Sequence, residues 1–335
     1  MATNPGTPVV KVRRLAREDL DAVVAIDAAL VGRTRRAYFE RRLAAALRQP
    51  EVHVQFAIEE GGVFRGHVLA RVLEGEFGRT SPALRLEVVS VSRDAHSHGL
   101  GRALHDAIEA EAKKRGITEL RTASTWRDHA MLRFLGAMGW RLAPATVAEC
   151  EIHADREKWP GARAAAAPPS PGDANDYGAA AANDFEALPR DTIDVRLLTL
   201  KDLDDVVRID RNATGRERAG YMRHALEEAL RDSAIRISLA GRLDGMTAGF
   251  IMARADLGDF GRAEPVAIID TIGVDPGYRG MGIGQALLSQ LFVNLAALRI
   301  ERVETVLSHD APELIAFFRA AGFSQGQRLA FFKAL

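Results

Sequence analysis

The sequence repeats itself after 183 residues, and this duplication restricts the folds that the chain can adopt. Over residues 12–48 the shift pairs 18 identical residues in 37 positions. The same shift places Gly99 and Gly101 on Gly282 and Gly284 without a gap. The repeat is too long for a solenoid unit, so each copy should form a whole domain of common size.

A segment of biased composition separates the two copies. Residues 154–191 are rich in Ala, Pro, Gly and Asp and include the run AAAAPPSP, which cannot build a hydrophobic core. We therefore predict a first domain over residues 8–153, a linker over 154–191 and a second domain over 192–335. Two such similar domains can pack as an intramolecular pseudo-dimer, and a homodimer of the whole chain stays open.

Composition excludes several classes of partner. Lys plus Arg and Asp plus Glu each number 45, so no basic surplus indicates binding to nucleic acid or to an anionic membrane. The sequence shows neither a signal peptide nor an apolar run of membrane-spanning length. Cys150 is the single cysteine, which excludes an internal disulfide and a cysteine-rich metal site. These features predict a cytoplasmic protein without a metal.

Strands and amphipathic helices alternate along the second copy. Apolar and β-branched runs predict strands at Asp194–Leu198, Ile235–Leu239, Met246–Arg254, Ala267–Val274, Arg302–Leu307 and Arg328–Phe332. Leu287, Leu291 and Leu295 recur at helical spacing in a helix that ends near Arg299. This order predicts a mixed α/β sheet, in which the strands on either side of that helix are parallel with a right-handed crossover.

A glycine-rich loop, Arg279–Gly284, lies between the buried strand and this helix. Glycines there allow positive φ and close approach, so that backbone N–H groups and the helix N-terminus can converge on phosphate oxygens. The loop is neither a Walker A sequence nor a Gly-x-Gly-x-x-Gly fingerprint, which disfavours nucleoside triphosphates and NAD. Such a loop suits a phosphate cradle and equally a tight structural corner.

The run from Ile272 to Gly284, followed by an apolar helix, resembles the GNAT superfamily of N-acetyltransferases. In that family an Arg/Gln-x-x-Gly-x-Gly/Ala loop holds the pyrophosphate of acetyl-CoA, and Arg279, Gly282 and Gly284 occupy those places. The helix that stops at Gly322 also matches, so the resemblance covers most of residues 192–335. It implies two tandem GNAT-like domains, each a mixed, splayed β-sheet flanked by helices.

The resemblance also implies acetyl-CoA as co-substrate. In the family, the strand before the loop diverges from its neighbour and pairs with the pantetheine arm. The residues that this assigns to the cofactor are Ile272, Gly273, Val274, Arg279, Gly280, Met281, Gly282, Ile283 and Gly284.

The first copy keeps the two glycines of the loop but has His96 in the place of Arg279. A histidine is mostly neutral at pH 7, so the pyrophosphate loses a permanent cation and should bind more weakly there. The first copy is therefore either a weakened second active site or a domain with only a structural role, and the structural role is favoured. His96 and His98 have no further predicted ligands to form a metal site.

Two residues are candidates for catalysis. Asp270 stands inside an apolar strand, where a carboxylate is costly without a purpose or a partner, so it is a candidate base. The family often has a glutamate at the place of Ile268, and the alternative for Asp270 is a carboxylate satisfied by backbone N–H groups or by an arginine. The family's proton-donating tyrosine is replaced by Phe318, which leaves Tyr221 as a candidate acid.

Other residues keep open alternatives. Ser308 and His309 are further candidates for the acid. The Gly-Arg-x-Arg segments, which include Arg35 in the first copy and Arg218 in the second, are predicted either to grip an acceptor carboxylate or to form ion pairs.

These features predict an acyltransferase that moves an acetyl group from acetyl-CoA to a primary amine of a small molecule or protein. The alternative is a non-enzymatic acyl-CoA-binding sensor or interaction module, which Ile268, Phe318 and the altered first loop would also suit.

Overall fold

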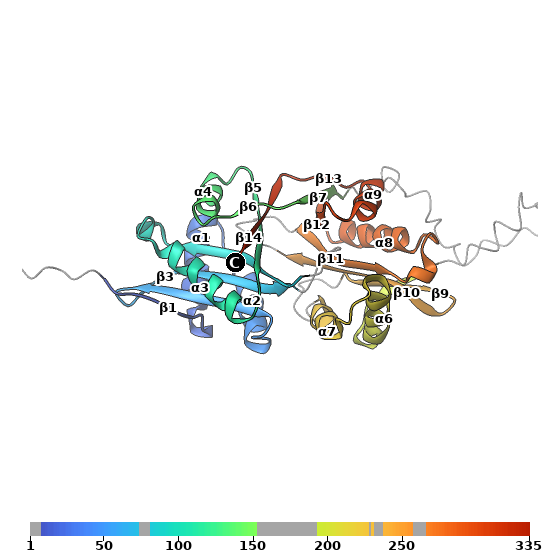
Figure 1. The fold of residues 1–335 in the computed structure, drawn as a ribbon, viewed down its shortest axis with the longest axis horizontal. Helices are drawn as coiled ribbons and strands as arrows, with labels where there is room; N and C mark the ends of the chain where they lie inside the picture. The colour runs from blue at the N-terminus through green and yellow to red at the C-terminus, as the bar shows by residue number, and fades with distance from the viewer. Residues whose placement is uncertain (1–7, 74–80, 153–192, 228, 231–236, 257–265) are drawn as a thin grey trace, which may run out of the picture.

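The described part of the chain forms two seven-stranded sheets, each flanked by helices (Figure 1). The computed structural model describes residues 8–73, 81–152, 193–227, 229–230, 237–256 and 266–335. The predicted linker, residues 154–191, lies outside these described residues.

The two copies have the same order of elements. In the first copy these are β1 (Val10–Arg14), α1 (Leu20–Val31), α2 (Arg36–Arg48), β2 (His53–Glu60), β3 (Val63–Leu73), β4 (Ala83–Val91), α3 (Leu100–Lys114), β5 (Glu119–Thr125), α4 (His129–Ala137), β6 (Arg141–Leu142) and β7 (Ala145–Glu151). In the second copy these are β8 (Asp194–Leu197), α6 (Leu203–Thr214), α7 (Ala219–Glu227), β9 (Leu239–Leu243), β10 (Met246–Asp256), β11 (Val266–Val274), α8 (Ile283–Ala297), β12 (Arg302–Ser308), α9 (Pro312–Ala320), β13 (Ser324–Gln325) and β14 (Arg328–Ala334).

Each sheet contains one parallel pair of strands, and this pair splays. Strands β11 and β12 pair in parallel at Ala267 opposite Val303 and at Ile268 opposite Glu304, and β11 then continues to Val274. In the first copy β4 and β5 pair in the same way over two residues. The parallel pairing of these strands, predicted from the sequence, is therefore confirmed, and a wedge opens between the strands on the side of the glycine loop.

The last strand of each copy belongs to the sheet of the other copy. Strand β7 lies between β12 and β13, and β14 lies between β5 and β6. Figure 1 shows the red β14 beside the green β5, with seven register pairs that run from Arg328 opposite Thr125 to Ala334 opposite Glu119. The pseudo-dimer is therefore held together by a reciprocal strand exchange within one chain.

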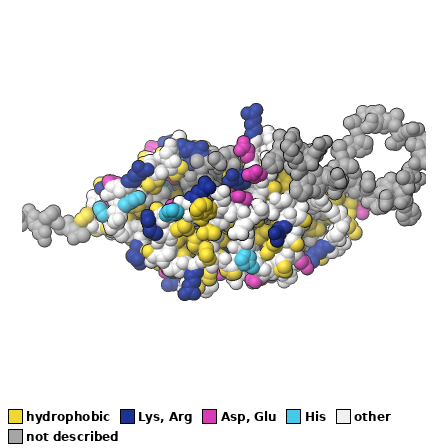
Figure 2. Space-filling model, turned by 90° about the horizontal axis from the view of Figure 1, so that it is seen from above, with side chains coloured by type: hydrophobic (Ala, Val, Ile, Leu, Met, Phe, Trp, Pro, Cys, Tyr) yellow, Lys and Arg dark blue, Asp and Glu magenta, His cyan; other side chains and the backbone are white. Residues whose placement is uncertain are grey.

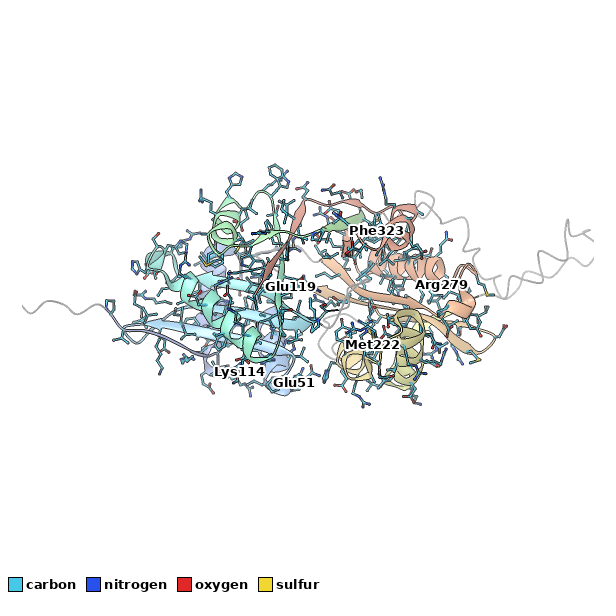
Figure 3. The ribbon with its side chains drawn as sticks, viewed as in Figure 1. Glu51, Lys114, Glu119, Met222, Arg279 and Phe323 are labelled. Atoms are coloured by element: carbon cyan, nitrogen blue, oxygen red, sulfur yellow. The ribbon has the colours of Figure 1, made fainter. Side chains whose placement is uncertain are left out.

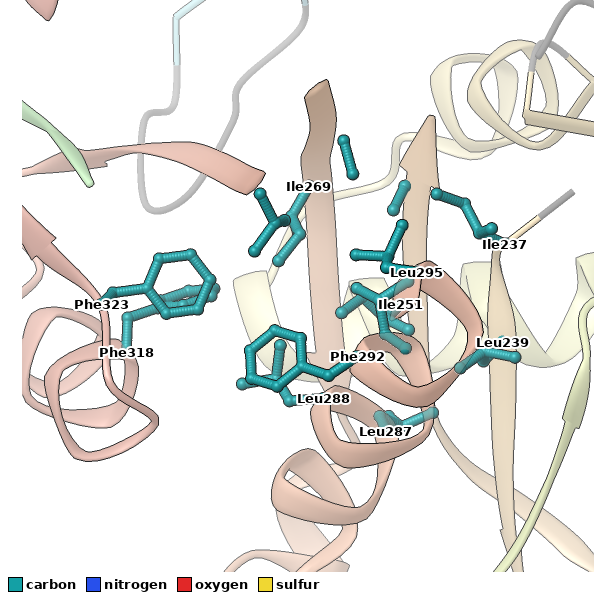
Figure 4. Close-up of a cluster of buried hydrophobic side chains, with 14 of the residues drawn as sticks. Ile237, Leu239, Ile251, Ile269, Leu287, Leu288, Phe292, Leu295, Phe318 and Phe323 are labelled. Carbon is teal, nitrogen blue, oxygen red and sulfur yellow. The ribbon is translucent and has the colours of Figure 1, made fainter. Parts of the chain in front are cut away.

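The core of the second copy lies between α8 and the sheet. Figure 4 shows Leu287 and Leu295 of α8 near Ile251 and Ile269 of the strands, and all four are at most 1% exposed. Burial of each such side chain contributes about 1.5–3 kcal/mol. The four-residue leucine spacing read from the sequence is the face of α8 that packs on the sheet.

One predicted strand ends later than expected. The sequence predicted a strand at 235–239, of which 235–236 lie outside the described residues, whereas β9 runs from Leu239 to Leu243. The reason is the two-residue turn at Asp244 and Gly245, whose φ values of 52° and 78° suit a tight hairpin to β10. An Asp-Gly pair is a strong hairpin signal, so the turn fixes where β9 ends.

The surface carries both signs of charge. On the face that Figure 2 shows, Lys and Arg side chains are interspersed with Asp and Glu side chains over the described residues. Within the described ranges, no helix is both long and apolar enough to cross a membrane. Nor do the described residues bring together three or more His, Cys, Asp or Glu side chains in a group that could hold a metal ion.

His67 makes the stability of the first copy depend on pH. It is fully buried beside Phe39, and burial, with a smaller effect of Arg35, lowers its pKa to about 3. The unfolded chain protonates this histidine below about pH 6.5 and the folded chain does not, so stability falls as pH drops below 6.5. From His67 alone we expect a loss of about 1.4 kcal/mol at pH 5.5.

Urea unfolding at pH 7.5 and 5.5 measures this loss. His67→Phe introduces the residue that the second copy has at this place, Phe250, and should reduce the difference between the two pH values. His129→Phe, at an exposed histidine, is the matched control and should retain it. If His67→Phe shows the same difference in unfolding free energy between the two pH values as the wild type, His67 is not its cause.

Candidate functional site

The glycine loop of the second copy forms an open corner at the start of α8. Strand β11 ends at Val274, a short 3-10 turn follows, and Gly280 and Gly282 both have a φ of 80°. The side chain of Arg279 is exposed, and Figure 3 shows it well away from the boundary with the first copy. Met281 is also exposed, so the backbone amides at the start of α8 face a solvent-accessible corner.

Sterics explain two of the glycines near this corner. A Cβ at Gly284 would lie 3.2 Å from the ring of Phe317, and a Cβ at Gly273 would lie 2.7 Å from the ring of Phe250. Helix α9 and strand β10 therefore come close to the loop and its preceding strand. With the amides of the helix N-terminus and the cation of Arg279, the corner suits a bound diphosphate.

The first copy has the same loop backbone with different side chains. Gly99 has a φ of 81°, and Ser97 has a φ of 68° where the second copy has Gly280. A serine in the left-handed region is strained, so the rest of the fold must hold it there. His96 Nε2 donates to the carbonyl oxygen of Val91 at 2.9 Å, which ties the side chain to the end of β4.

An open cleft of about 860 Å³ lies in the first copy, beside this loop. Val88–Val91 line it where β4 diverges from β5, together with Gly99–Arg102 and Phe134. The sequence favoured a structural role for this copy, and the cleft is a feature that sequence reasoning missed. Its only sequence signal was the pair of glycines at the start of α3.

The second copy has a salt bridge between α6 and the loop region, and its two residues are replaced in the first copy. In the second copy Arg208 on α6 donates through Nη1 to Asp275 Oδ2 at 2.5 Å and through Nη2 to the carbonyl oxygen of Thr247 at 2.7 Å. The equivalent residues of the first copy are Ala25 and Ser92, which cannot form this pair. Helix α6 is therefore fastened to the loop region by a contact that α1 cannot make.

The structure brings the two predicted catalytic residues together. Asp270 and Tyr221 both line a cavity of about 130 Å³ at the boundary between the copies. Asp270 Oδ2 accepts from Arg254 Nε at 2.9 Å, and the Asp270 side chain remains 18% exposed. The arginine partner matches one alternative predicted for this carboxylate, while the exposure leaves it accessible from the cavity. Val274 lies four positions along β11 from Asp270, a distance of about 13 Å.

The remaining candidates take structural positions. Phe318 is fully buried, with its ring 4.9 Å from that of Phe323. His309 Nε2 lies 3.0 Å from Thr146 Oγ1 on the exchanged strand β7. Ser308 is buried at the end of β12, where it pairs with β7.

The arginines near the start of α2 and α7 form ion pairs. Arg218 Nε donates to Asp210 Oδ2 at 3.0 Å, and Arg35 Nε donates to Asp27 Oδ2 at 2.8 Å. Both pairs are buried, so these guanidinium groups hold the first two helices of each copy together.

Comparison with known proteins gives one consistent family. The sequence profile of the Acetyltransferase (GNAT) family matches residues 20–140 and again 203–323. An aminoglycoside N(6')-acetyltransferase type 1 from Stenotrophomonas maltophilia is 32% identical in an alignment of 116 positions that covers 32% of this chain and 72% of that protein.

Solved structures match over both copies. A tandem GNAT protein from the clavulanic acid biosynthesis pathway superimposes with a TM-score of 0.63 at 17% identity, over 97% of this chain and 98% of that one. A GCN5-related N-acetyltransferase from Sphaerobacter thermophilus gives 0.53 at 15% identity, over 97% and 95%. A glucosamine N-acetyltransferase region of a fungal multi-domain GH3 β-N-acetylglucosaminidase gives 0.60 at 14% identity, and this chain spans 38% of that protein.

Proposed function

Because the chain belongs to the GNAT acetyltransferase family, we propose that it transfers an acetyl group from acetyl-CoA to a primary amine of a small molecule or protein. The observation that carries the proposal is the corner formed by Arg279–Gly284 at the start of α8, beside the splayed strands. The similarity to an aminoglycoside N-acetyltransferase supports an amine as the acceptor.

Acetyl-CoA supplies the activated acyl group, and this chain supplies its binding site and the proton transfers. The guanidinium of Arg279 and the amides from Gly280 to Gly284 would hold the diphosphate by charge-assisted hydrogen bonds. The backbone of Ile272, Gly273 and Val274, at the splayed end of β11, would pair with the pantetheine arm.

Acid and base chemistry is assigned to the boundary cavity. An amine attacks only when it is neutral, so a base must take its proton, and Asp270 is accessible from the cavity for that role. Tyr221 lines the same cavity and is the candidate proton donor to the leaving thiolate.

Arg279→Ala is expected to weaken binding of coenzyme A. Loss of a hydrogen bond to a charged group costs about 1.5–3 kcal/mol, which is a roughly 10- to 100-fold rise in Kd. Isothermal titration calorimetry with coenzyme A measures it. His96→Ala is the matched control at the equivalent place in the first copy, and it removes no permanent charge. An unchanged Kd in Arg279→Ala would remove the loop of the second copy from the cofactor site.

Release of free thiol from acetyl-CoA in the presence of a panel of primary amines tests the reaction itself. Amine-dependent release is the expected result. Binding of acetyl-CoA without release for any amine would replace the proposed enzyme by an acyl-CoA-binding module.

A further inference from the structure

The boundary cavity is built by both copies. Arg71 of the first copy lines it together with Tyr221, Ala225, Arg254 and Asp270 of the second. Glu51 also lines it, and Figure 3 shows this residue at the boundary, across from α7. The cavity is large enough for several water molecules or for the end of a small ligand.

The corresponding corner of the first copy is filled by a cation. The 183-residue shift places Arg42 at the position of Ala225 and Glu87 at the position of Asp270. Arg42 Nε donates to Glu87 Oε2 at 2.7 Å, and its Nη2 donates to the carbonyl oxygen of Ala70 at 2.8 Å. Both side chains are buried, so this guanidinium is an integral part of the corner.

The second copy lacks this cation and keeps the carboxylate. Ala225 ends at its Cβ, and Asp270 is one methylene shorter than Glu87, so both substitutions open space at the same corner. The two arginines of the cavity wall each face a carboxylate. Arg254 Nε lies 2.9 Å from Asp270 Oδ2, and Arg71 Nε lies 3.8 Å from Glu87 Oε1. Among the described residues, the lining of the cavity has two arginines and two carboxylates, Glu51 and Asp270, whereas Arg42 and Arg71 outnumber Glu87 at the corresponding corner of the first copy.

We propose that the boundary cavity is an acceptor subsite for a cationic nitrogen group, and that a primary alkylammonium or guanidinium end of the acceptor occupies there the place of the Arg42 guanidinium. Asp270 receives this group as Glu87 receives Arg42: an alkylammonium held there is the group whose proton Asp270 then takes, whereas a guanidinium is held there without reacting. The first copy cannot take an acceptor of this kind, because its own arginine blocks the equivalent corner. The inference rests on the proposed function only in calling the ligand an acceptor.

Two simple probes, propylamine and ethylguanidine, test the site by saturation-transfer NMR on the full chain. Both are expected to bind the wild-type chain and to bind at least tenfold more weakly to Ala225→Arg, which copies the arginine of the first copy. Gly220→Arg places the same side chain at an exposed position of the same helix, α7, and should bind like the wild type. In the Ala225→Arg chain, the added substitution Arg42→Ala should restore probe binding by opening the equivalent corner of the first copy.

Two further variants protect the test against misfolding. Ala225→Met fills the cavity without a charge, and Asp270→Asn removes the charge without filling it, so both should weaken binding. Circular dichroism and the Kd for coenzyme A, unchanged in Ala225→Met, would show that the fold and cofactor site are intact. Equal probe binding by the wild type and Ala225→Arg, or no binding by the wild type, would overturn the inference. Probe binding without acetylation of any amine would overturn the proposed function and leave the cation site standing.

Discussion

Expressed separately, residues 8–153 and residues 192–335 are expected not to fold as stable monomers, and to assemble into a one-to-one complex when mixed. The first half lacks β14, which lies between β5 and β6 in its sheet. The second half lacks β7, which lies between β12 and β13. Only two residues, Ala143 and Pro144, join β6 to β7. The fixed φ of Pro144, about −65°, disfavours the sharp reversal that would return β7 to its own sheet.

Size-exclusion chromatography with light scattering and urea unfolding measure this dependence. The matched control is a chain of both halves cut by an inserted protease site within residues 154–191, which breaks the same connection but supplies every strand. It should stay assembled as a one-to-one complex, with an unfolding midpoint that rises with protein concentration, unlike that of the uncut chain. A cooperative unfolding transition of either half as a monomer would show that the exchange is dispensable.

Asp270→Asn is expected to lower kcat for amine acetylation by about 10²–10⁴-fold, the usual contribution of a general base. The amide keeps the shape of the carboxylate but cannot take the amine proton. The Kd for coenzyme A should stay unchanged, because the loop at Arg279 lies about 13 Å or more along the chain from Asp270. Thiol release at saturating acetyl-CoA measures kcat.

Glu87→Gln makes the same chemical change at the equivalent position of the first copy and serves as the control. Its carboxylate is buried and forms an ion pair with Arg42, so the substitution should lower the free energy of unfolding. It should leave kcat close to that of the wild type. If Asp270→Asn keeps full turnover, Asp270 only balances the charge of Arg254, and the base must be sought elsewhere.

The parts of the molecule that depend on local sequence were predictable. The duplication gave two domains of one fold, and the leucine spacing of α8 gave the face that packs on the sheet. The loop Arg279–Gly284 was placed between a buried strand and a helix because glycine spacing and apolar runs are local signals. The parallel pair of strands followed from this strand, helix and strand order.

The strand exchange could not be predicted, because duplication makes the two last strands interchangeable. Val147 in β7 and Ala330 in β14 occupy equivalent positions and are both buried, so either strand suits either sheet. The open cleft of the first copy and the boundary cavity were missed for a related reason. They depend on how the sheets assemble: the cleft lies where β4 diverges from β5, and the boundary cavity lies where Arg71 of the first copy meets Ala225, which stands in place of Arg42.

The position of β14 has a consequence for folding during translation. The strand that completes the first sheet is not made until the ribosome has added all the residues between Leu142 and Arg328. At about 5–20 residues per second this takes roughly 10–40 seconds. Throughout this interval the nascent first sheet has β5 without its neighbour, an open edge that can pair with other chains. Protection of that edge by chaperones would therefore be needed earliest for the half of the protein that is synthesised first.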